Sequence, residues 1–485
     1  MKLYLRGHSD RYAVEQLQMQ LFPDEPSEYV EAPFSNENGA VSTLSEGRVF
    51  CTATARITRG GKTAFAARRF RKDLCGVRER RRILQQAYFL AAVQLLDAPP
   101  PWGALAGVRP TKLSTAFLRD GGSPAACDRM LRERYFVLPE RRRLCVDSSL
   151  YTLRALEQTQ PEDLSVYIGV PFCPTRCAYC SFVSESVEKF GSLLEPYLQA
   201  LLREVRETGK LLRETSSRVR TLYIGGGTPT TFSAVQLKQL LDAVRESFDL
   251  SRCLEITVEG GRPDTLDAEK LRVIRAAGVD RVSINPQTMS DAVLKRIGRR
   301  HSAAQTLAAY RDAREAGFPC INTDLIAGLP GDTVEGFSDS LRQLLALEPE
   351  NITVHTLALK KGADLFSSRA DLPDGAAVAK MLADADRLLR GAGYEPYYLY
   401  RQKYTSGGFE NVGWCKPGTQ CLYNIYMMEE VHTVLALGGG GMTKLQFAQN
   451  DLTRFHNPKF PQEYIARIDD VLKTKREVVD LLNHS

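Results

Sequence analysis

Short apolar runs alternate with longer amphipathic stretches from Leu164 onward. The runs are rich in Val, Ile and Thr, which is typical of strands. They lie at Leu164–Val170, Val219–Ile224, Leu254–Glu259, Arg281–Ile284, Ile321–Ile326 and Ile352–Thr356. Between most of them apolar residues recur at helical spacing, as in Leu193–Leu212, Ser233–Ser247 and Asp267–Ala277. Strands that alternate with helices predict parallel βαβ units, and six such units with right-handed crossovers predict an α/β fold with a partial (β/α)6 barrel.

A different pattern precedes the barrel and predicts a separate α+β domain. Two strand-like stretches, Arg48–Thr58 and Thr63–Phe70, flank Arg59-Gly60-Gly61-Lys62, whose glycines favour a hairpin turn. A helical pattern runs from about Gly76 to Leu96 and ends before three consecutive prolines. We therefore expect an N-terminal α+β domain over residues 1–158, the barrel core over 159–365 and a smaller C-terminal region over 366–485.

The C-terminal region carries two further predicted features. Four consecutive glycines at 438–441 predict a tight turn. Residues 454–476 predict a terminal helical cap with no candidate chemistry.

A short motif follows each predicted strand of the barrel. The six motifs are PFCPTRCAYC (171–180), GGGTPT (225–230), EGGRPD (259–264), INPQTM (284–289), TDLIAGLPGDT (323–333) and HTLALKKG (355–362). In (β/α) barrels the functional groups lie on the loops that follow the strands. We therefore expect the six motifs to form a single site at one rim.

Composition sets broad limits on the class of protein. The chain has 485 residues, of which 43% are hydrophobic and 25% charged, as in ordinary globular proteins. It contains no run of about 18 apolar residues, so we expect no membrane span. Residues 1–18 lack the apolar core of a signal peptide, and we expect the protein in the cytoplasm.

Charge is distributed unevenly along the chain. Residues 1–150 contain 24 Lys and Arg and 16 Asp and Glu, a net charge of +8, whereas the remainder has 40 and 42, a net charge of −2. Much of the excess lies in Arg68–Lys72 and Arg78–Arg82, with a third patch at Arg141–Arg143. Such patches could contact nucleic acid or a polycarboxylate substrate, or they could form the solvated face of a helix.

Eleven cysteines are too few for a disulfide scaffold in a chain of this length. Eight of them are scattered and predict small buried side chains. The other three, Cys173, Cys177 and Cys180, have the spacing C-x3-C-x2-C on one predicted loop. Three thiolates on a four-iron cluster leave one iron open to a substrate or cofactor. Zinc is the alternative, but a catalytic zinc would normally recruit a His, and every His lies far away in sequence.

The cysteine spacing, with Tyr179 before the last cysteine, resembles the signature of radical S-adenosylmethionine (SAM) enzymes. The resemblance implies a [4Fe-4S] cluster on Cys173, Cys177 and Cys180, with one or two SAM molecules. In that superfamily the amino and carboxylate groups of SAM chelate the open iron. An electron then cleaves SAM to methionine and a 5′-deoxyadenosyl radical, which takes a hydrogen atom from the substrate. The cofactor supplies this chemistry, and the protein positions it and excludes water.

The same resemblance implies roles for other rim residues. Gly226, Gly227 and Thr228 of GGGTPT are expected at the methionine ammonium, where glycines let the backbone approach a ligand. The motif matches neither common phosphate-binding glycine pattern. Further cofactor contacts are expected from Tyr167 (also the catalytic candidate), Tyr179, Glu259, Gln287, Arg299, Asp324 and the backbone of Ala358. Structural alternatives are that Asp324 caps a turn and that Arg299 is a surface charge.

Longer stretches narrow the resemblance. YIGVPFCPTRCAYCSF, GGGTPT, SINPQTM with IGRRH, DLIAGLPGDT and FENVGWCKPGTQCLYNI resemble the oxygen-independent coproporphyrinogen III oxidase family, most closely its HemZ branch, from Leu164 to the C-terminus. The family converts two propionates of coproporphyrinogen III to the vinyl groups of protoporphyrinogen IX in haem biosynthesis. A hydrogen atom is removed, carbon dioxide leaves and one electron passes to an acceptor. Arginines suit the substrate carboxylates, and the candidates are Arg109, Arg262, Arg299 and Arg300.

Three segments depart from the family pattern. Gly169 replaces a His, Ser181-Phe182 replaces Gly-Cys after the third cysteine, and residues 423–428 (YNIYMM) replace H-N-x-x-Y-W. Two other functions therefore remain candidates. One is a HemW-type chaperone that binds haem or another tetrapyrrole, with His355 or His432 as axial ligand. The other is a radical SAM enzyme acting on another tetrapyrrole or on RNA.

The expected partners follow from the family. Coproporphyrinogen III is the expected small-molecule substrate, and a low-potential carrier such as flavodoxin or ferredoxin is the expected electron donor. We expect a monomer without a nucleic-acid partner.

Overall fold

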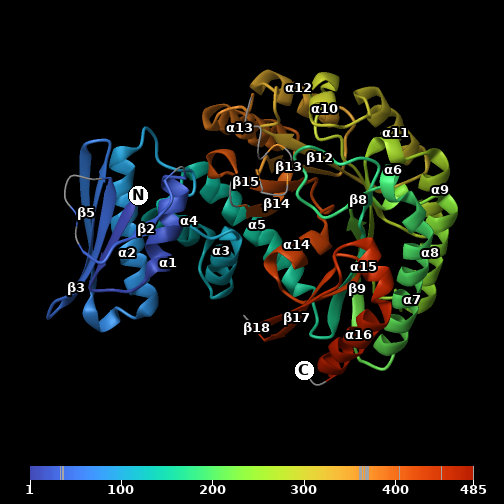
Figure 1. Cartoon of the computed structure of the whole chain (residues 1–485), viewed down its shortest axis with the longest axis horizontal. Coiled ribbons are helices and arrows are strands. Elements are labelled where there is room, and N and C mark those ends of the chain that lie inside the picture. Colours follow the sequence, from blue (N-terminus) through green and yellow to red (C-terminus); the bar gives the residue numbers. More distant parts are fainter. Residues whose placement is uncertain are drawn as a thin grey trace. The chain divides into compact units, whose positions relative to one another are not determined.

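Two units make up the computed structural model of the chain, Met1–Val146 and Asp147–Ser485 (Figure 1). The structure describes residues 1–23, 25–32, 34, 38–359, 363, 365, 371–402, 405–448 and 451–483. The division between the units falls inside helix α5 (Pro139–Glu157). The domain limits at 158/159 and 365/366 stay predictions. Residues 360–362, which end the HTLALKKG motif, lie outside the described residues.

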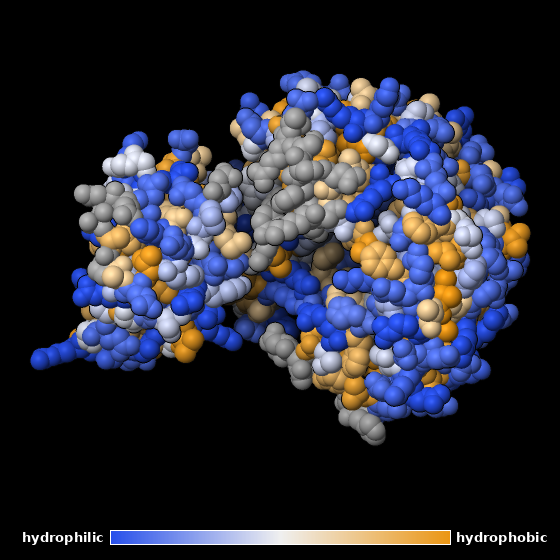
Figure 2. Space-filling view, in the orientation of Figure 1, coloured by the Kyte–Doolittle hydropathy of each residue, from blue (hydrophilic) through white to orange (hydrophobic). Residues whose placement is uncertain are grey.

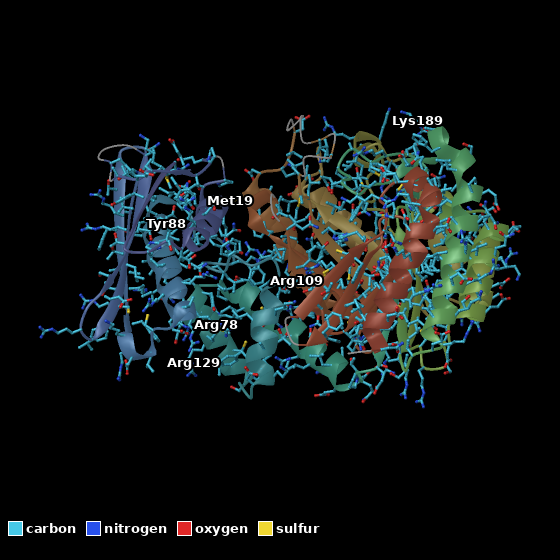
Figure 3. All side chains as sticks on the ribbon, turned by 60° about the horizontal axis from the view of Figure 1, so that its bottom comes forward. Met19, Arg78, Tyr88, Arg109, Arg129 and Lys189 are labelled. Carbon is cyan, nitrogen blue, oxygen red and sulfur yellow. The ribbon has the colours of Figure 1, made fainter. Side chains whose placement is uncertain are left out.

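The first unit is an α+β domain built on a sheet with the order β2-β1-β3-β4-β5. Its strands are β1 (Lys2–Arg6), β2 (Glu28–Tyr29), β3 (Gly39–Glu46), β4 (Phe50–Arg59) and β5 (Lys62–Arg71), and its helices are α1 (Arg11–Leu21), α2 (Val77–Ala92), α3 (Pro110–Arg119) and α4 (Pro124–Tyr135). The predicted hairpin is confirmed, because Arg59 pairs with Lys62 and both glycines between them have positive φ. Alternate residues of β4 pack against the apolar face of α2, where Tyr88 is fully buried and donates to Gln18 (Figure 3).

The second unit is built on a sheet with the order β14-β15-β13-β12-β11-β10-β9-β6-β16-β17-β18. Its six central strands are β6 (Asp163–Val170), β9 (Arg218–Gly226), β10 (Glu255–Gly261), β11 (Arg281–Ile284), β12 (Cys320–Ala327) and β13 (Asn351–Thr356). Each pairs in parallel with its neighbour. Each lies within two residues of its predicted limits. The α/β fold with a partial (β/α)6 barrel is therefore confirmed.

Helices cover the outer face of this sheet (Figure 1). They are α7 (Leu194–Leu212), α8 (Ala234–Ser247), α9 (Ala268–Ala276), α10 (Asp291–Arg296), α11 (Ala303–Glu315), α12 (Val334–Leu345) and α13 (Gly375–Gly391). Each turns an apolar stripe inward, as α7 does with the fully buried Leu198, Leu201 and Val205. Hydrophilic residues cover most of the visible outer surface (Figure 2). Within the described ranges, no helix has the length and apolarity needed to cross a membrane.

Five further strands extend the sheet and have no counterpart in the prediction. They are β14 (Glu395–Arg401), β15 (Glu410–Cys415), β16 (Thr433–Gly438), β17 (Met442–Ala448) and β18 (Asp451–His456). Strand β16 is parallel to β6, whereas β17 and β18 form an antiparallel pair beyond it. Helix α14 (Leu422–Glu429) lies between β15 and β16 in sequence.

The two C-terminal predictions have different outcomes. The glycine turn is confirmed, because it joins β16 to β17 and Gly438 and Gly440 have φ of +81° and +73°. The helical cap over 454–476 is wrong at its start, because residues 454–456 pair with β17 as the end of β18. Helices α15 (Pro461–Ala466) and α16 (Ile468–Asn483) follow.

Candidate functional site

A cavity of about 380 Å³ lies at the carboxyl ends of the parallel strands. Its volume is within the range of pockets that hold small-molecule ligands. All thirteen residues predicted to contact the cluster or SAM line it: Tyr167, Cys173, Cys177, Tyr179, Cys180, Gly226, Gly227, Thr228, Glu259, Gln287, Arg299, Asp324 and Ala358. The structure thus brings the loops after the strands together at one rim, while the role of each residue stays a prediction.

The three cysteines lie on residues 173–180, here called the cysteine loop. Short strands hold its entrance, because β7 (Phe172–Cys173) pairs with β8 (Glu185–Ser186). In its middle, the Ala178 N–H donates to the Ile297 carbonyl at 3.0 Å. All three cysteines are free thiols, with Cys177 buried and the other two partly exposed. The fold therefore presents three thiols of one loop to one cavity.

Two glycines let the end of β9 approach this loop. An added Cβ would lie 2.4 Å from the Phe172 carbonyl oxygen at Gly227 and 2.9 Å from the Val170 nitrogen at Gly226, whose φ is +115°. The Thr228 N–H donates to the Phe172 carbonyl at 2.6 Å. The nearest obstacle to a side chain is thus the protein backbone itself. The glycines are needed for packing against the cysteine loop, in addition to any contact with a ligand.

Glu259, at the end of β10, is held by two donors. The Tyr223 hydroxyl donates to one of its carboxylate oxygens at 2.5 Å, and the Gly226 N–H donates to the other at 3.2 Å. Burial raises the pKa of Glu259 to about 7, although the bond from Tyr223 opposes the shift. The carboxyl group therefore changes its charge close to neutral pH.

Asp324 and Gln287 belong to neighbouring strand ends. Asp324 lies within β12, accepts from the Asn322 amide at 2.9 Å and is 3.5 Å from His355, so the alternative of a turn cap is wrong. Gln287 has an unusual φ of +72° for a residue with a Cβ. Its backbone is fixed on both sides, since its N–H donates to the Asp324 carbonyl and its carbonyl accepts from Ile326, both at 3.0 Å.

The four candidate arginines have different surroundings. Arg262 is buried, donates to Thr175 of the cysteine loop at 2.6 Å and pairs with Asp264. Arg299 is also buried and donates to the Asn285 carbonyl and the Tyr179 hydroxyl, so the alternative of a surface charge is wrong. Arg300 is exposed, pairs with Glu188 and lies outside the cavity lining. Arg109 immediately precedes α3 in the first unit.

Three tyrosines stack beside the cavity. The ring centroids of Tyr223 and Tyr423 are 4.5 Å apart, and the Tyr167 ring lies 6.3 and 6.2 Å from them. Burial raises the pKa of all three phenols, with Glu259 adding to the effect, so they stay protonated at neutral pH. The stack forms an aromatic wall that connects β6, β9 and α14.

Comparison with known proteins identifies the family. A sequence model of the radical SAM superfamily matches residues 167–344. The oxygen-independent coproporphyrinogen-III oxidase-like protein HemZ of Bacillus subtilis (strain 168) is 40% identical over 377 residues, which cover 76% of this chain and 75% of HemZ. The chain belongs to the HemZ branch of the radical SAM oxygen-independent coproporphyrinogen III oxidase family.

Two other similarities accompany this membership. The heme chaperone HemW of Haemophilus influenzae is 32% identical over 304 residues, which cover 62% of this chain and 76% of HemW. The solved structure of coproporphyrinogen III oxidase (HemN) from Escherichia coli aligns with a TM-score of 0.53 and 24% identity, covering 66% of this chain and 72% of that one. The second similarity shows a shared fold.

Membership in the radical SAM superfamily implies a [4Fe-4S] cluster, and the cysteine loop fits one. In the part of the chain that the structure describes, no three His, Cys, Asp or Glu side chains converge closely enough to hold a single metal ion. A cubane cluster does not require the three thiolates to converge on one metal ion, because each thiolate binds a different iron. Three free thiols on one loop at one cavity match that requirement.

The superfamily also implies SAM, and two polar atoms of the cavity fit a bound ligand. The side-chain oxygens of Gln287 and Asn285 are buried and have no hydrogen-bond partner in the described structure. Leaving such an acceptor unpaired costs about 1–3 kcal/mol. A ligand with hydroxyl or ammonium donors would remove that cost.

Several polar cavity residues were missed as cofactor contacts, among them Asn285, His355, Tyr400, Gln402 and Asn411. His355 entered the sequence analysis only as a haem ligand. Tyr400 lies in β14, with Gln402 just beyond it, and Asn411 lies near the start of β15. The run EPYYLYR has the composition of a strand and could have indicated β14. Its pairing through β15 with β13, which brings it to this rim, is a long-range contact.

Proposed function

We propose that the chain catalyses the oxygen-independent oxidative decarboxylation of coproporphyrinogen III to protoporphyrinogen IX. The observation that carries the proposal is the cavity in which three cysteines of one loop face the polar ends of the barrel strands. The 40% identity with HemZ, whose name refers to the same substrate, supports the choice of a porphyrinogen.

Different cavity residues would bind the cluster and SAM. Cys173, Cys177 and Cys180 would hold the [4Fe-4S] cluster, and the backbone of Gly226 and Gly227 would accept from the SAM ammonium. When bound, cluster and SAM supply the 5′-deoxyadenosyl radical that takes a hydrogen atom from the substrate. Glu259 and Gln287 would accept hydrogen bonds from SAM. Burial and the two donors hold Glu259 in one orientation for that role.

Residues around the cysteine loop would position the substrate. Tyr167 lines the cavity and stacks with Tyr223 and Tyr423, so the aromatic stack supports its ring at that side of the cavity. Phe182, two residues after Cys180, lines the cavity and is 69% exposed, so its ring is available to pack on a pyrrole face. Arg176 of the same loop also lines the cavity and supplies a cation suited to a propionate carboxylate.

A haem chaperone is the second candidate function, favoured by the 32% identity with HemW. His355 lines the cavity, and its imidazole is 27% exposed, so it could bind haem iron. His432 is a poor candidate because it is buried, bonds to Ser165 at 2.7 Å and packs on Tyr426. Burial lowers the pKa of His432 to about 3, which keeps the imidazole neutral.

An anaerobic assay tests the proposal. Reconstituted full-length protein would be incubated with SAM, dithionite and coproporphyrinogen III, and tetrapyrroles and 5′-deoxyadenosine followed by mass spectrometry. We expect stepwise loss of two carboxyl groups with deoxyadenosine formed in proportion, and no product from Cys177→Ala. Release of deoxyadenosine with an unchanged porphyrinogen would reject the decarboxylase. Stoichiometric haem binding with a Soret band that shifts in His355→Ala would then support the chaperone.

A further inference from the structure

A second hollow lies on the outer side of the cysteine loop. It has a volume of about 630 Å³ and is lined by Thr175, Arg176, Asp291, Lys295, Arg300 and Ser302, among others. Thr175 and Arg176 line both this hollow and the main cavity, and both residues lie between Cys173 and Cys177. The cysteine loop is therefore the wall between the two spaces.

Hydrogen bonds join the cysteine loop directly to the segment that follows α10 at the hollow. Residues 297 and 298, which follow α10, provide carbonyl acceptors for the loop. The Ala178 N–H donates to the Ile297 carbonyl at 3.0 Å, and the Thr175 hydroxyl donates to the Gly298 carbonyl at 3.4 Å. A molecule in the hollow would thus be separated from the cysteines by the thickness of a single loop.

The hollow carries an excess of positive charge. Arg176, Lys295 and Arg300 are exposed cations in its lining, against the single exposed carboxylate of Asp291. Arg300 pairs with Glu188 but its side chain is still 66% exposed. Lys189, next to that glutamate on α6 (Val187–Phe190), adds another exposed cation (Figure 3). The potential at this surface is therefore positive.

We propose that the basic hollow is the docking surface for a protein electron carrier with an acidic surface. This inference rests on the proposed radical SAM function, because only that chemistry requires an electron to reach the cluster. The carrier, a reduced flavoprotein or iron–sulfur protein, gives up one electron and the cluster gains it, and no proton or bond is exchanged. The opposite side of the loop faces the main cavity, where SAM and substrate would block a protein. Complexes of this kind are small and weak, and opposite charges steer their association.

The test compares a protein donor with a chemical one. The reconstituted full-length chain would receive electrons from reduced flavodoxin, which is acidic, or from dithionite, with 5′-deoxyadenosine as the readout. We expect Lys189→Glu/Lys295→Glu to lower the flavodoxin-driven rate at least tenfold and to leave the dithionite-driven rate unchanged. Raising the salt concentration should lower only the flavodoxin-driven rate of the wild type. Arg311→Glu, an exposed change near the far end of α11, is the matched control and should behave as wild type.

Direct binding separates this inference from the function on which it rests. The dissociation constant for flavodoxin would be measured by calorimetry with the wild type, the double variant and the control. At least tenfold weaker binding by the double variant alone would support docking even if no SAM cleavage were seen. Equal binding by all three proteins would overturn the docking surface, whatever the activity. If the wild type did not cleave SAM with dithionite as the reductant, that result would instead count against the proposed function.

Discussion

Lys475 on α16 and Glu204 on α7 form an ion pair that is almost completely shielded from water. Their charged atoms are 3.3 Å apart, and the side chains are 1% and 0% exposed. Asn457 bridges them, donating to Glu204 and accepting from Lys475, both at 3.0 Å. Glu204 also accepts from the Gly438 N–H at 2.7 Å, and Gly438 lies beside Gly169 at the end of β6. The pair thus connects the C-terminal helix to the strand that leads into the cysteine loop.

Breaking this pair on one side should destabilise the second unit strongly. Lys475→Met leaves the Glu204 carboxylate buried without its cation, which typically costs about 3–5 kcal/mol. The double change Glu204→Gln/Lys475→Met removes both charges and should cost less than the single change. Free energies of unfolding from denaturant titrations would measure both effects.

An exposed ion pair between the same two helices provides the control. Arg203 and Asp469 are 2.7 Å apart, with side chains 52% and 82% exposed. Arg203→Met should cost less than about 1 kcal/mol, because water screens such pairs. Equal losses of unfolding free energy in Arg203→Met and Lys475→Met would show that the buried pair stabilises the protein no more than the exposed pair.

Replacing one cysteine of the loop should remove the cluster without unfolding the protein. In Cys177→Ala two thiols remain, and the small buried side chain is replaced by one of similar size. We expect iron and sulfide to fall to background, with the circular dichroism of the apo protein unchanged. Cys253→Ala, which alters a partly buried thiol outside the cavity, should keep its iron. Wild-type iron content in Cys177→Ala would contradict the assignment of the cluster.

The central strands and their motifs could be predicted because each strand is buried. A run rich in β-branched residues, such as Ile352–Thr356, can be recognised as a strand without knowledge of its partner. The loop that follows a parallel strand then has a known place at one rim of the barrel. Strands β14 to β18 were missed. Some of them pair locally, as β17 does with β18, but the pairings that attach them to the barrel are remote in sequence. Strand β16, for example, pairs with β6, whose residues lie more than 260 positions earlier.

The contacts of each side chain within the site were harder to predict than which residues line the cavity. The sequence indicates that Glu259 follows a strand, but the neighbours that hold it, Tyr223 and the Gly226 N–H, come from another strand. GGGTPT suggested backbone contact with a ligand, whereas the structure shows that the glycines also admit the backbone of Phe172. Arg299 and Arg300 are adjacent in sequence, yet one is buried and the other exposed. Such differences arise from tertiary packing.

The pKa of Glu259 should make stability depend on pH. Burial raises this pKa from 4.5 to about 7, so the folded state favours the protonated carboxyl group. Its contribution is fully present below about pH 4.5 and is lost as the pH rises through 7. The full difference corresponds to about 3 kcal/mol. Glu259→Gln, which stays neutral, should therefore gain stability relative to the wild type between pH 5 and pH 8.

Unfolding free energies of wild type and Glu259→Gln at several pH values would measure this effect, because other titrating groups cancel in the difference. Asp249→Asn is a suitable control between pH 5 and pH 8, since Asp249 lies on the surface beyond α8 and hydrogen bonds from Ser251 lower its pKa, so it stays ionised over that range. A difference between wild type and Glu259→Gln that does not change with pH would show that Glu259 is ionised throughout.

Adding one methyl group at Gly227 should disturb the cysteine loop and SAM binding together. The new Cβ would lie 2.4 Å from the Phe172 carbonyl oxygen, so the end of β9 or the start of the loop must move. Overpacking of this kind typically costs about 1–3 kcal/mol, which corresponds to a loss of roughly tenfold or more in affinity. We expect Gly227→Ala to bind SAM at least tenfold more weakly in equilibrium dialysis and to hold less iron. Gly391→Ala, where an added Cβ meets nothing within 4 Å, should leave both properties unchanged. Normal SAM affinity in Gly227→Ala would mean that the contact between β9 and the cysteine loop does not position the cofactor.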